Sequence, residues 1–273
     1  HNAARAVADI GRPAAGSPEF NAGYNYIKKI PSPKGGALLD RSDLYSIEGN
    51  YNFSKFTHKI ADVLVGVNFR RYSLNSQGTL FADSTGPIGI KEYGAYIQAS
   101  RSITNNLKIS ASGRYDKNEN FEGRFTPRIT ALYKVAENNN IRLSYQTAYR
   151  FPSNQQQWIN LVLPGYNLIG GNKNFIDFYK FNSNPVYYQA NMLNGQMVQW
   201  NYPLQKPESL SSFELGYKGL LMKSKLFIDM YGYYGNYTNF TARTFVVQSK
   251  TGVPLTPADA LTGQVYSVPI NAP

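Results

Sequence analysis

Cysteine is missing from this chain of 273 residues, and histidine is nearly missing. Without a thiol the chain can form no disulfide and no thiolate metal site. The two imidazoles, His1 and His58, are too few and too far apart in the sequence for a histidine metal cluster or for serine-histidine catalysis. We therefore predict no catalytic residue, no cofactor-binding residue and no metal ligand, and we do not expect an enzyme.

Acidic residues are also scarce, and long apolar runs are absent. The chain has 17 Asp and Glu residues and 28 Lys and Arg residues, which gives a formal net charge of +11. The basic residues form no dense cluster of the kind that binds nucleic acid, so we expect no nucleic-acid partner. No stretch approaches the roughly 20 apolar residues of a membrane-spanning helix. Membrane-spanning strands stay possible, because each needs only about 9 to 11 residues of alternating polarity.

Aromatic residues and glycine, by contrast, are abundant, with 22 Tyr, 15 Phe and 23 Gly. Aromatic side chains fit a pleated surface, so the composition favours an all-β chain. Runs of alternating polarity bounded by Gly, Asn, Ser and Pro predict eight strands. Their expected bounds are 43–53, 59–72, 92–101, 107–116, 126–135, 141–150, 208–219 and 225–240.

The connections between these strands alternate between short and long. Short turns (SKFTH, SITNN, AENNN and LLMKS) close every second connection, whereas long ones begin at Ser73, Lys117 and Phe151. Outer-membrane barrels have short periplasmic turns and long extracellular loops, so this alternation sets an orientation. It predicts extracellular loop regions at 1–42, 151–207 and 241–273, six strands within 43–150 and two strands within 208–240.

Charge separates the two faces of the predicted strands. One face carries apolar and aromatic residues such as Ile129, Tyr133, Leu143 and Tyr145, and its Tyr residues often sit near strand ends. The opposite face carries five arginines, Arg70, Arg114, Arg128, Arg142 and Arg150. A soluble sandwich alternates in the same way. Terminal Tyr residues are typical of the aromatic girdles of a barrel, however, which favours a transmembrane antiparallel β-barrel.

Four segments resemble the barrel of TonB-dependent outer-membrane receptors. They are GRFTPRITALYKV, IRLSYQTAYRFP, KPESLSSFELGYKG and KLFIDMYGYYGNYTNF, in this order. HNAARAVADIGRP and LVGVNFRRYSLNSQGTLFAD resemble the SusC-like subgroup, whose members often carry a carboxypeptidase-regulatory-like domain ahead of the plug. The resemblance covers nearly the whole chain.

Receptors of this family are 22-stranded barrels with a plugged lumen. The resemblance therefore implies that the eight strands are a fragment of a larger barrel and that the plug domain lies outside this chain. We expect the chain to stop within a loop, at VYSVPINAP. A stand-alone eight-stranded barrel is the structural alternative, and its interior arginines would need close acidic partners.

The resemblance also implies a function and a location. We expect active import of a large nutrient, a glycan or a peptide, through the outer membrane of a Gram-negative bacterium. The partners implied are outer-membrane lipids, the plug, the TonB complex and a SusD-like surface lipoprotein. A non-transporting SusC-like barrel that serves as a structural subunit is the alternative, and an outer-membrane hydrolase is the least favoured reading.

Two groups of side chains are candidate binding residues. The long loop carries aromatic residues among Asn and Gln, which could stack on sugars or pack on a peptide: Trp158, Tyr166, Tyr179, Tyr187, Tyr188 and Trp200. The alternative is that these rings pack the loop onto itself or onto the lipoprotein. The five arginines either guide substrate through the lumen or pair with acids of the plug and barrel. IGGNKN at 169–174 lacks the spacing of a phosphate-binding loop.

Overall fold

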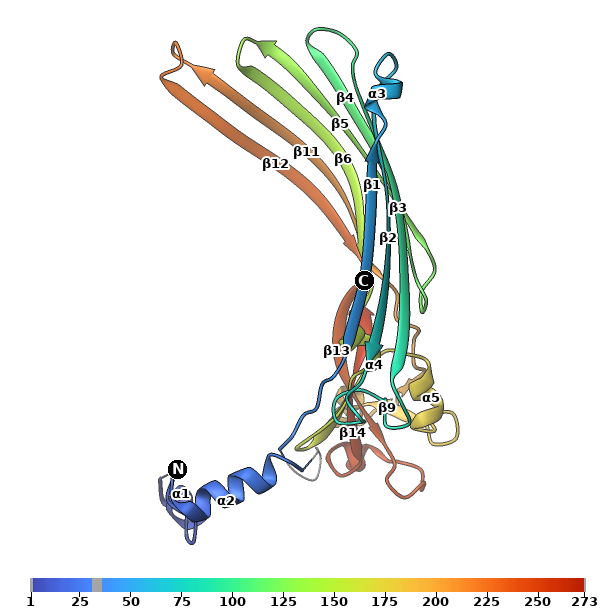
Figure 1. Ribbon diagram of the computed structural model, residues 1–273. Coiled ribbons are helices and arrows are strands. Elements are labelled where there is room, and N and C mark those ends of the chain that lie inside the picture. Colours follow the sequence, from blue (N-terminus) through green and yellow to red (C-terminus); the bar gives the residue numbers. More distant parts are fainter. Residues whose placement is uncertain (1, 31–35, 273) are drawn as a thin grey trace.

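The computed structural model describes residues 2–30 and 36–272. His1, and the parts of the two terminal loop regions at 31–35 and 273, lie outside the described residues. The chain forms an eight-stranded sheet, called the wall below, and a six-stranded sheet, called the outer sheet (Figure 1). The outer sheet lies at one end of the long wall strands.

All eight predicted strands are present in the wall. They follow the order β1-β2-β3-β4-β5-β6-β11-β12, and every neighbouring pair is antiparallel. Their bounds are β1 (Asp43–Asn52), β2 (Asp62–Leu74), β3 (Ile88–Ser102), β4 (Leu107–Asn118), β5 (Arg124–Ala136), β6 (Asn139–Arg150), β11 (Glu208–Leu221) and β12 (Leu226–Thr238). The third strand begins at Ile88 instead of residue 92, because its ladder with β2 continues to the pair Leu74–Ile88. The all-β antiparallel prediction is confirmed.

Short turns gather at one end of the wall and long connections at the other (Figure 1). The helix α3 (Ser54–Thr57) fills the first short turn, between β1 and β2. In the turn between β5 and β6, Asn138 adopts a positive φ of 59°, a conformation that Asn tolerates better than most residues. The predicted alternation of connection lengths is present at most connections, but the β4–β5 connection at 119–123 is shorter than the β1–β2 turn at 53–61.

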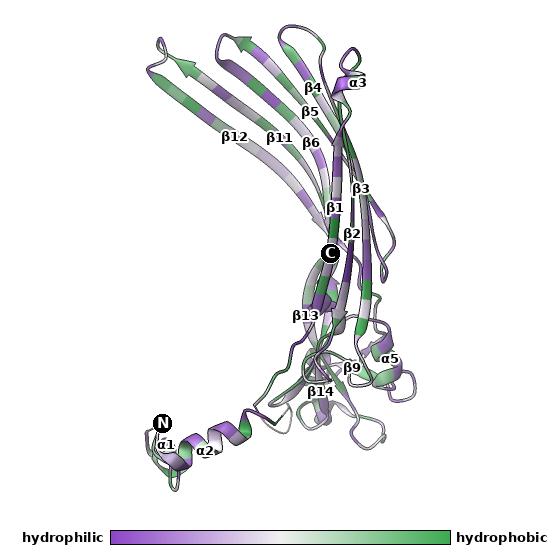
Figure 2. Cartoon of the chain, viewed as in Figure 1, coloured by the Kyte–Doolittle hydropathy of each residue, from purple (hydrophilic) through white to green (hydrophobic). Residues whose placement is uncertain are grey.

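The wall leaves its apolar face uncovered. Ile97, Ile129, Leu143 and Leu215 are each more than half exposed, although they lie on central strands. Alternating hydrophilic and hydrophobic bands run along the same strands (Figure 2). A soluble sandwich would bury such a face, so the wall fits a sheet that borders lipid. The wall is also an open sheet with β1 and β12 at its edges, so the closed eight-stranded barrel is not what forms.

The outer sheet combines two segments that are distant in the sequence. Its order is β10-β9-β13-β14-β8-β7, and only β14 and β8 among these neighbours are parallel within the described residues. The bounds are β7 (Asn160–Leu163), β8 (Tyr166–Ile169), β9 (Val186–Tyr188), β10 (Gln199–Trp200), β13 (Phe240–Gln248) and β14 (Gln264–Ala272). The regions expected as loops at 151–207 and 241–273 thus contain a sheet, whose strands the periodicity did not indicate.

Short helices and a buried cluster complete the outer sheet. The helices are α4 (Asn154–Trp158), α5 (Asn174–Phe178), α6 (Gln189–Leu193) and the 3-10 helix η1 (Pro257–Leu261). The cluster consists of Ile169, Phe175, Phe181, Val186, Trp200, Tyr202, Val246, Tyr266 and Val268. This part of the chain therefore has a hydrophobic core of its own.

Two helices precede the wall, and the all-β prediction missed both of them. They are α1 (Asn2–Ala8) and α2 (Pro18–Ile27), and they project away from both sheets (Figure 1). Ser17 caps α2, because its hydroxyl accepts a hydrogen bond from the Phe20 N–H at 3.1 Å. Within the described residues, no helix is both long and apolar enough to cross a membrane.

Candidate functional site

Ion pairs connect three of the five predicted lumen arginines to acids of the wall. Arg114 lies 2.6 Å from Asp116, Arg142 pairs with Glu214, and Arg150 lies 3.0 Å from Glu208. This agrees with pairing to neighbouring barrel acids. Among the described residues, Arg70 and Arg128 have no ion pair.

A glycine makes room for the Arg114 guanidinium. The guanidinium reaches Asp116 on its own strand and donates to the Asn68 Oδ1 atom two strands away at 2.8 Å. It crosses Gly94 to do so. A Cβ at residue 94 would lie 2.2 Å from the Asn68 Oδ1 atom and 2.7 Å from the guanidinium. The lack of a side chain at Gly94 therefore permits this three-strand contact.

Arg70, Arg114 and Arg150 line one polar cavity of about 610 Å³ on the wall. Glu92 and Asp116 line the same cavity, so cations exceed acids among these five side chains. The structure thus brings three of the five predicted arginines together. Arg128 and Arg142 lie elsewhere on the same face, at register positions opposite Gln146 and Gly216.

Pro127 ends the hydrogen-bonded ladder between β5 and β6 below this cavity. The ladder runs from Ala136–Asn139 to Arg128–Gln146 and stops there. Proline has no backbone N–H to donate, so it interrupts pairing with the next strand. Beyond this point Ala148 and Tyr149 turn to the cavity, which they line. The ladder therefore ends beside the cavity, which Thr126 and Thr147 also line.

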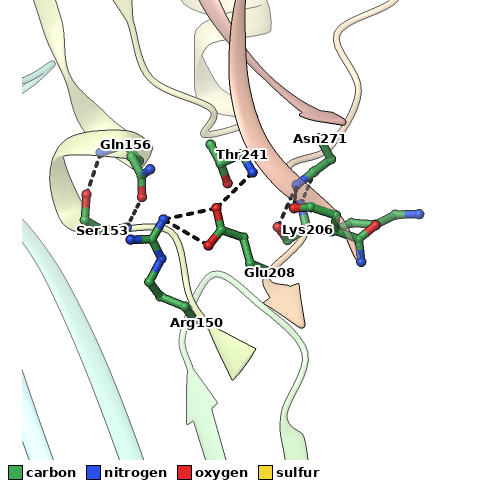
Figure 3. Close-up of polar contacts among 8 residues, drawn as sticks. Arg150, Ser153, Gln156, Lys206, Glu208, Thr241 and Asn271 are labelled. Carbon is green, nitrogen blue, oxygen red and sulfur yellow. Dashed lines mark hydrogen bonds and ion pairs between the residues drawn. The ribbon is translucent and has the colours of Figure 1, made fainter. Parts of the chain in front are cut away.

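Glu208 and Asn271 join the wall to the outer sheet (Figure 3). The Glu208 carboxylate accepts a hydrogen bond from the Arg150 guanidinium at 3.0 Å and another from the Thr241 backbone N–H at 2.8 Å. The Asn271 side chain accepts from the Lys206 N–H at 2.7 Å and donates to the Lys206 carbonyl at 3.0 Å. Glu208, the first residue of β11, is thereby bonded to β13, and Lys206, two residues before β11, is bonded to β14. Sequence reasoning identified Arg150 but neither of these two partners.

The helix α4 begins shortly after Arg150, and its N-terminus is capped. Ser153 and Gln156 form a capping box at the start of α4, in which the Ser153 Oγ atom accepts from the Gln156 N–H at 3.1 Å. In the reciprocal contact, the Ser153 N–H donates to the Gln156 Oε1 atom at 2.8 Å, and Figure 3 shows both hydrogen bonds. The helix α4 then presents Gln157 and Trp158, which are both buried.

The six predicted loop aromatics mostly pack inside the outer sheet. Trp200 belongs to its core, and Tyr179 and Tyr188 pack against that core. Tyr187 packs on a smaller cluster around Val247. The remaining two are Tyr166, which contacts Phe245 ring to ring, and Trp158, which belongs to a cluster with Leu74, Phe81 and Ile90. This packing agrees with the expectation that the loop folds onto itself.

Burial keeps the phenols of the outer sheet neutral. It raises the pKa of Tyr179 to about 12 and raises the pKa of Tyr202 and Tyr266 above the ordinary value of a phenol. Neutral hydroxyls can donate, and Tyr202 donates to the Gly170 carbonyl at 2.8 Å, with the Asn172 carbonyl at 2.9 Å. These hydrogen bonds hold the GGN segment, residues 170–172, against the core.

A family model described as "TonB dependent receptor-like, beta-barrel" matches residues 10–271. No match is found among the curated proteins.

Solved outer-membrane receptors are similar to this chain in fold. The siderophore receptor PirA from Pseudomonas aeruginosa superposes with a TM-score of 0.58 at 16% sequence identity, covering 86% of this chain and 38% of the receptor. A mutant of the ferric enterobactin receptor PfeA from the same organism gives a TM-score of 0.58 at 13% identity, covering 88% and 33%. PirA from Acinetobacter baumannii gives 0.53 at 13% identity, covering 88% and 34%. The chain thus spans about a third of the length of the receptors it matches, and at this identity the likeness shows the fold alone.

Proposed function

Because this chain belongs to the TonB-dependent receptor β-barrel family, we propose that it supplies wall, lumen lining and outer surface to a receptor that imports a large nutrient. Membership in this family places the chain in the outer membrane of Gram-negative bacteria, and the family consists of transport receptors and not of enzymes. Import would be driven by the TonB complex acting on a plug domain inside the completed barrel.

One observation carries this proposal: the two faces of the wall suit two different solvents. One face exposes Ile129, Leu143 and Leu215, and a charge placed at the midplane of such a lipid-facing surface costs about 2–4 kcal/mol. The other face carries Arg114 and Arg142 with their acidic partners, as a hydrated lumen requires.

The substrate we propose is a glycan or a peptide too large for porins. Amide and aromatic side chains in residues 151–207 support this class, because amides bond hydroxyl and peptide groups while rings stack on sugars. The receptors similar in fold are receptors for siderophores, which adds ferric siderophores to the substrates worth testing. We further propose a SusC-like receptor with a SusD-like lipoprotein on its outer surface, supported by the resemblance of the segment at 64–83.

Uptake by cells with and without TonB tests the proposal. Cells that express the full receptor are given labelled oligosaccharides, peptides or ferric siderophores, and a strain that lacks the receptor serves as the control. We expect receptor-dependent uptake of one class that disappears when TonB is deleted. Undiminished uptake without TonB would refute energised import. Absence of any receptor-dependent uptake would favour the structural subunit.

A further inference from the structure

A group of cations lies on the apolar face of the wall, at the strand ends next to the outer sheet. Arg71 lies near the end of β2, Lys91 near the start of β3 and Lys117 near the end of β4. These three residues are called the basic patch below. Side chains an even number of residues apart on a strand share a face, so each cation shares the face of exposed apolar or aromatic side chains on its own strand: Val67, Ile97 and Tyr115.

The strand register brings the basic patch together. Arg71 is directly opposite Lys91, and Lys117 is opposite Tyr93, two residues from Lys91. The Cβ atoms of directly opposite residues are about 4.5–5.5 Å apart, and like charges in such pairs destabilise a sheet. The Lys117 ammonium donates to the Phe121 carbonyl at 2.5 Å, an acceptor that carries no compensating charge. The basic patch therefore calls for an anion.

The acids of the protein do not neutralise the basic patch. Among the described residues, no acid forms an ion pair with any of its members. Two acids, Asp43 and Glu119, share the face, and the Glu119 carboxylate accepts a hydrogen bond from the Lys91 backbone N–H at 3.0 Å. Arg41, whose N–H extends the β1–β2 ladder, adds a fourth cation. Four positive charges thus meet two negative ones.

Aromatic rings set the depth of the basic patch in the membrane. Phe69 and Tyr93 are paired two residues before Arg71 and Lys91 on the same face, and their ring centroids lie 5.4 Å apart. Tyr45, opposite Arg71, is 63% exposed. Aromatic girdles lie at the level of the lipid head groups. Two residues along a strand span about 7 Å, so Arg71 and Lys91 lie at the outer edge of the head-group level.

Charge on this face is concentrated on β2, β3 and β4. Besides the basic patch, the face has two charged residues within the eight wall strands, Asp43 at the start of β1 and Arg101 at the far end of β3. On β6, β11 and β12 the corresponding outer positions are uncharged, with Thr147, Ser211 and Asn236 in register. The basic patch is therefore a local site and not a uniform band around the wall.

We propose that the basic patch binds the phosphate groups of lipopolysaccharide, the phosphorylated glycolipid of the outer leaflet of Gram-negative outer membranes. The planar Arg71 guanidinium suits two phosphate oxygens at once, and Lys91 adds a point charge beside it. Phosphates lie at the depth that the aromatic rings mark, whereas the acyl chains meet apolar side chains such as Ile97. The assignment to the outer leaflet follows from the predicted extracellular position of the long connections. The site is independent of the imported substrate.

Native mass spectrometry of the full receptor in detergent, titrated with bisphosphorylated lipid A, tests the site. Arg71→Gln and Lys91→Gln each remove one charge from an exposed position. From the usual contribution of a basic residue at an anionic lipid surface, we expect about fivefold weaker binding in each variant and about 25-fold weaker binding in the double variant. Arg71→Lys keeps the charge and should bind within about threefold of the wild type. Loss of neither charge affecting the affinity would refute the proposal.

Arg101→Gln is the matched control. Arg101 is an exposed cation on the same strand and the same face as Lys91, but it lies at the other end of β3. We expect its loss to leave the affinity for lipid A within about twofold of the wild type, because the head group does not reach it. An equal loss in Arg101→Gln and Lys91→Gln would show a diffuse attraction and no local site. Heat-modifiable gel migration checks that every variant is folded, as we expect for exposed positions.

Three further probes separate the phosphorylated glycolipid from other anions. Lipid A without its phosphates should bind at least about tenfold more weakly, because only the acyl chains and sugars remain to hold it. Equal binding of this form would refute the phosphate contact. Phosphatidylglycerol that binds as tightly as lipid A would reassign the site to anionic phospholipids, and displacement of lipid A by inorganic phosphate at equal concentration would reassign it to a free anion. Either result would overturn the proposal.

Discussion

The wall and the outer sheet are both β-structure, but they are stabilised by different surroundings. Wall strands run for 10 to 15 residues, and their apolar side chains are largely exposed. Outer-sheet strands run for two to nine residues, and they enclose a buried core of Phe, Trp, Tyr, Val and Ile. The wall needs lipid to cover its apolar face, whereas the outer sheet covers its own.

The outer sheet depends on the wall for its assembly. Residues 160–200 supply four of its strands, and residues 240–272 supply β13 and β14. The hairpin of β11 and β12 separates the two segments in the sequence. Pairing of β9 with β13 and of β8 with β14 therefore closes long loops through the wall, which is entropically costly before the core contacts form.

Phe175→Ala should have the largest effect on stability, and it should act on the outer sheet alone. Phe175 is 1% exposed within the outer-sheet core, and truncation of a buried Phe costs about 3–5 kcal/mol. Hydrogen exchange of the full receptor in detergent would measure the loss as faster exchange in residues 160–202 and 240–272. The wall strands should exchange as before.

Phe178→Ala on the same helix is the control. Phe178 is 55% exposed, so we expect the stability to change by less than about 1 kcal/mol. If Phe175→Ala speeds exchange in the wall as much as in the outer sheet, the two regions unfold as one unit and the outer sheet has no separate stability.

Leu143→Arg should have the next largest effect, and it should act on the wall. Leu143 is 55% exposed on the apolar face, and an arginine near the midplane of the bilayer costs about 2–4 kcal/mol. The urea midpoint of the receptor folded in lipid vesicles should fall accordingly. Thr130→Arg is the control, because Thr130 lies on the opposite face, in register with Ser110 and Ser144. Equal losses in both variants would contradict the assignment of the two faces.

The wall was predictable from the sequence because lipid imposes a simple pattern. A strand that crosses a bilayer must alternate over its whole length, so the run from Ile141 to Arg150 indicated β6 almost to its ends. A pair such as Arg114–Asp116 was predictable from spacing alone, because residues two apart on one strand share a face. The pairing of Arg150 with Glu208 was not, because it depends on the register between β6 and β11.

The outer sheet was not predictable, for physical reasons. Strands such as β10 (Gln199–Trp200) are too short to show a period, and β8 is paired with β14 from the far end of the chain. The Ser17–Pro18 start of α2 is a pattern typical of a helix N-terminus, and the all-β expectation did not use it.

Glu208→Ala should have the smallest effect of the three, and it acts where the two regions meet. The variant removes the acceptor of the Thr241 N–H and the partner of Arg150. A hydrogen bond to a charged group contributes about 1.5–3 kcal/mol, and the exposed Arg150 pair adds little to that. Hydrogen exchange at the start of β13 should therefore accelerate.

Glu214→Ala is the matched control for this prediction. Glu214 lies on the same strand and pairs with Arg142, but it makes no hydrogen bond to the outer sheet among the described residues. Its loss should leave exchange in β13 unchanged, because the contact it removes lies wholly within the wall. If Glu214→Ala loosens β13 as much as Glu208→Ala does, the outer sheet responds to the charge of the wall as a whole, and Glu208 is no specific link between the two sheets.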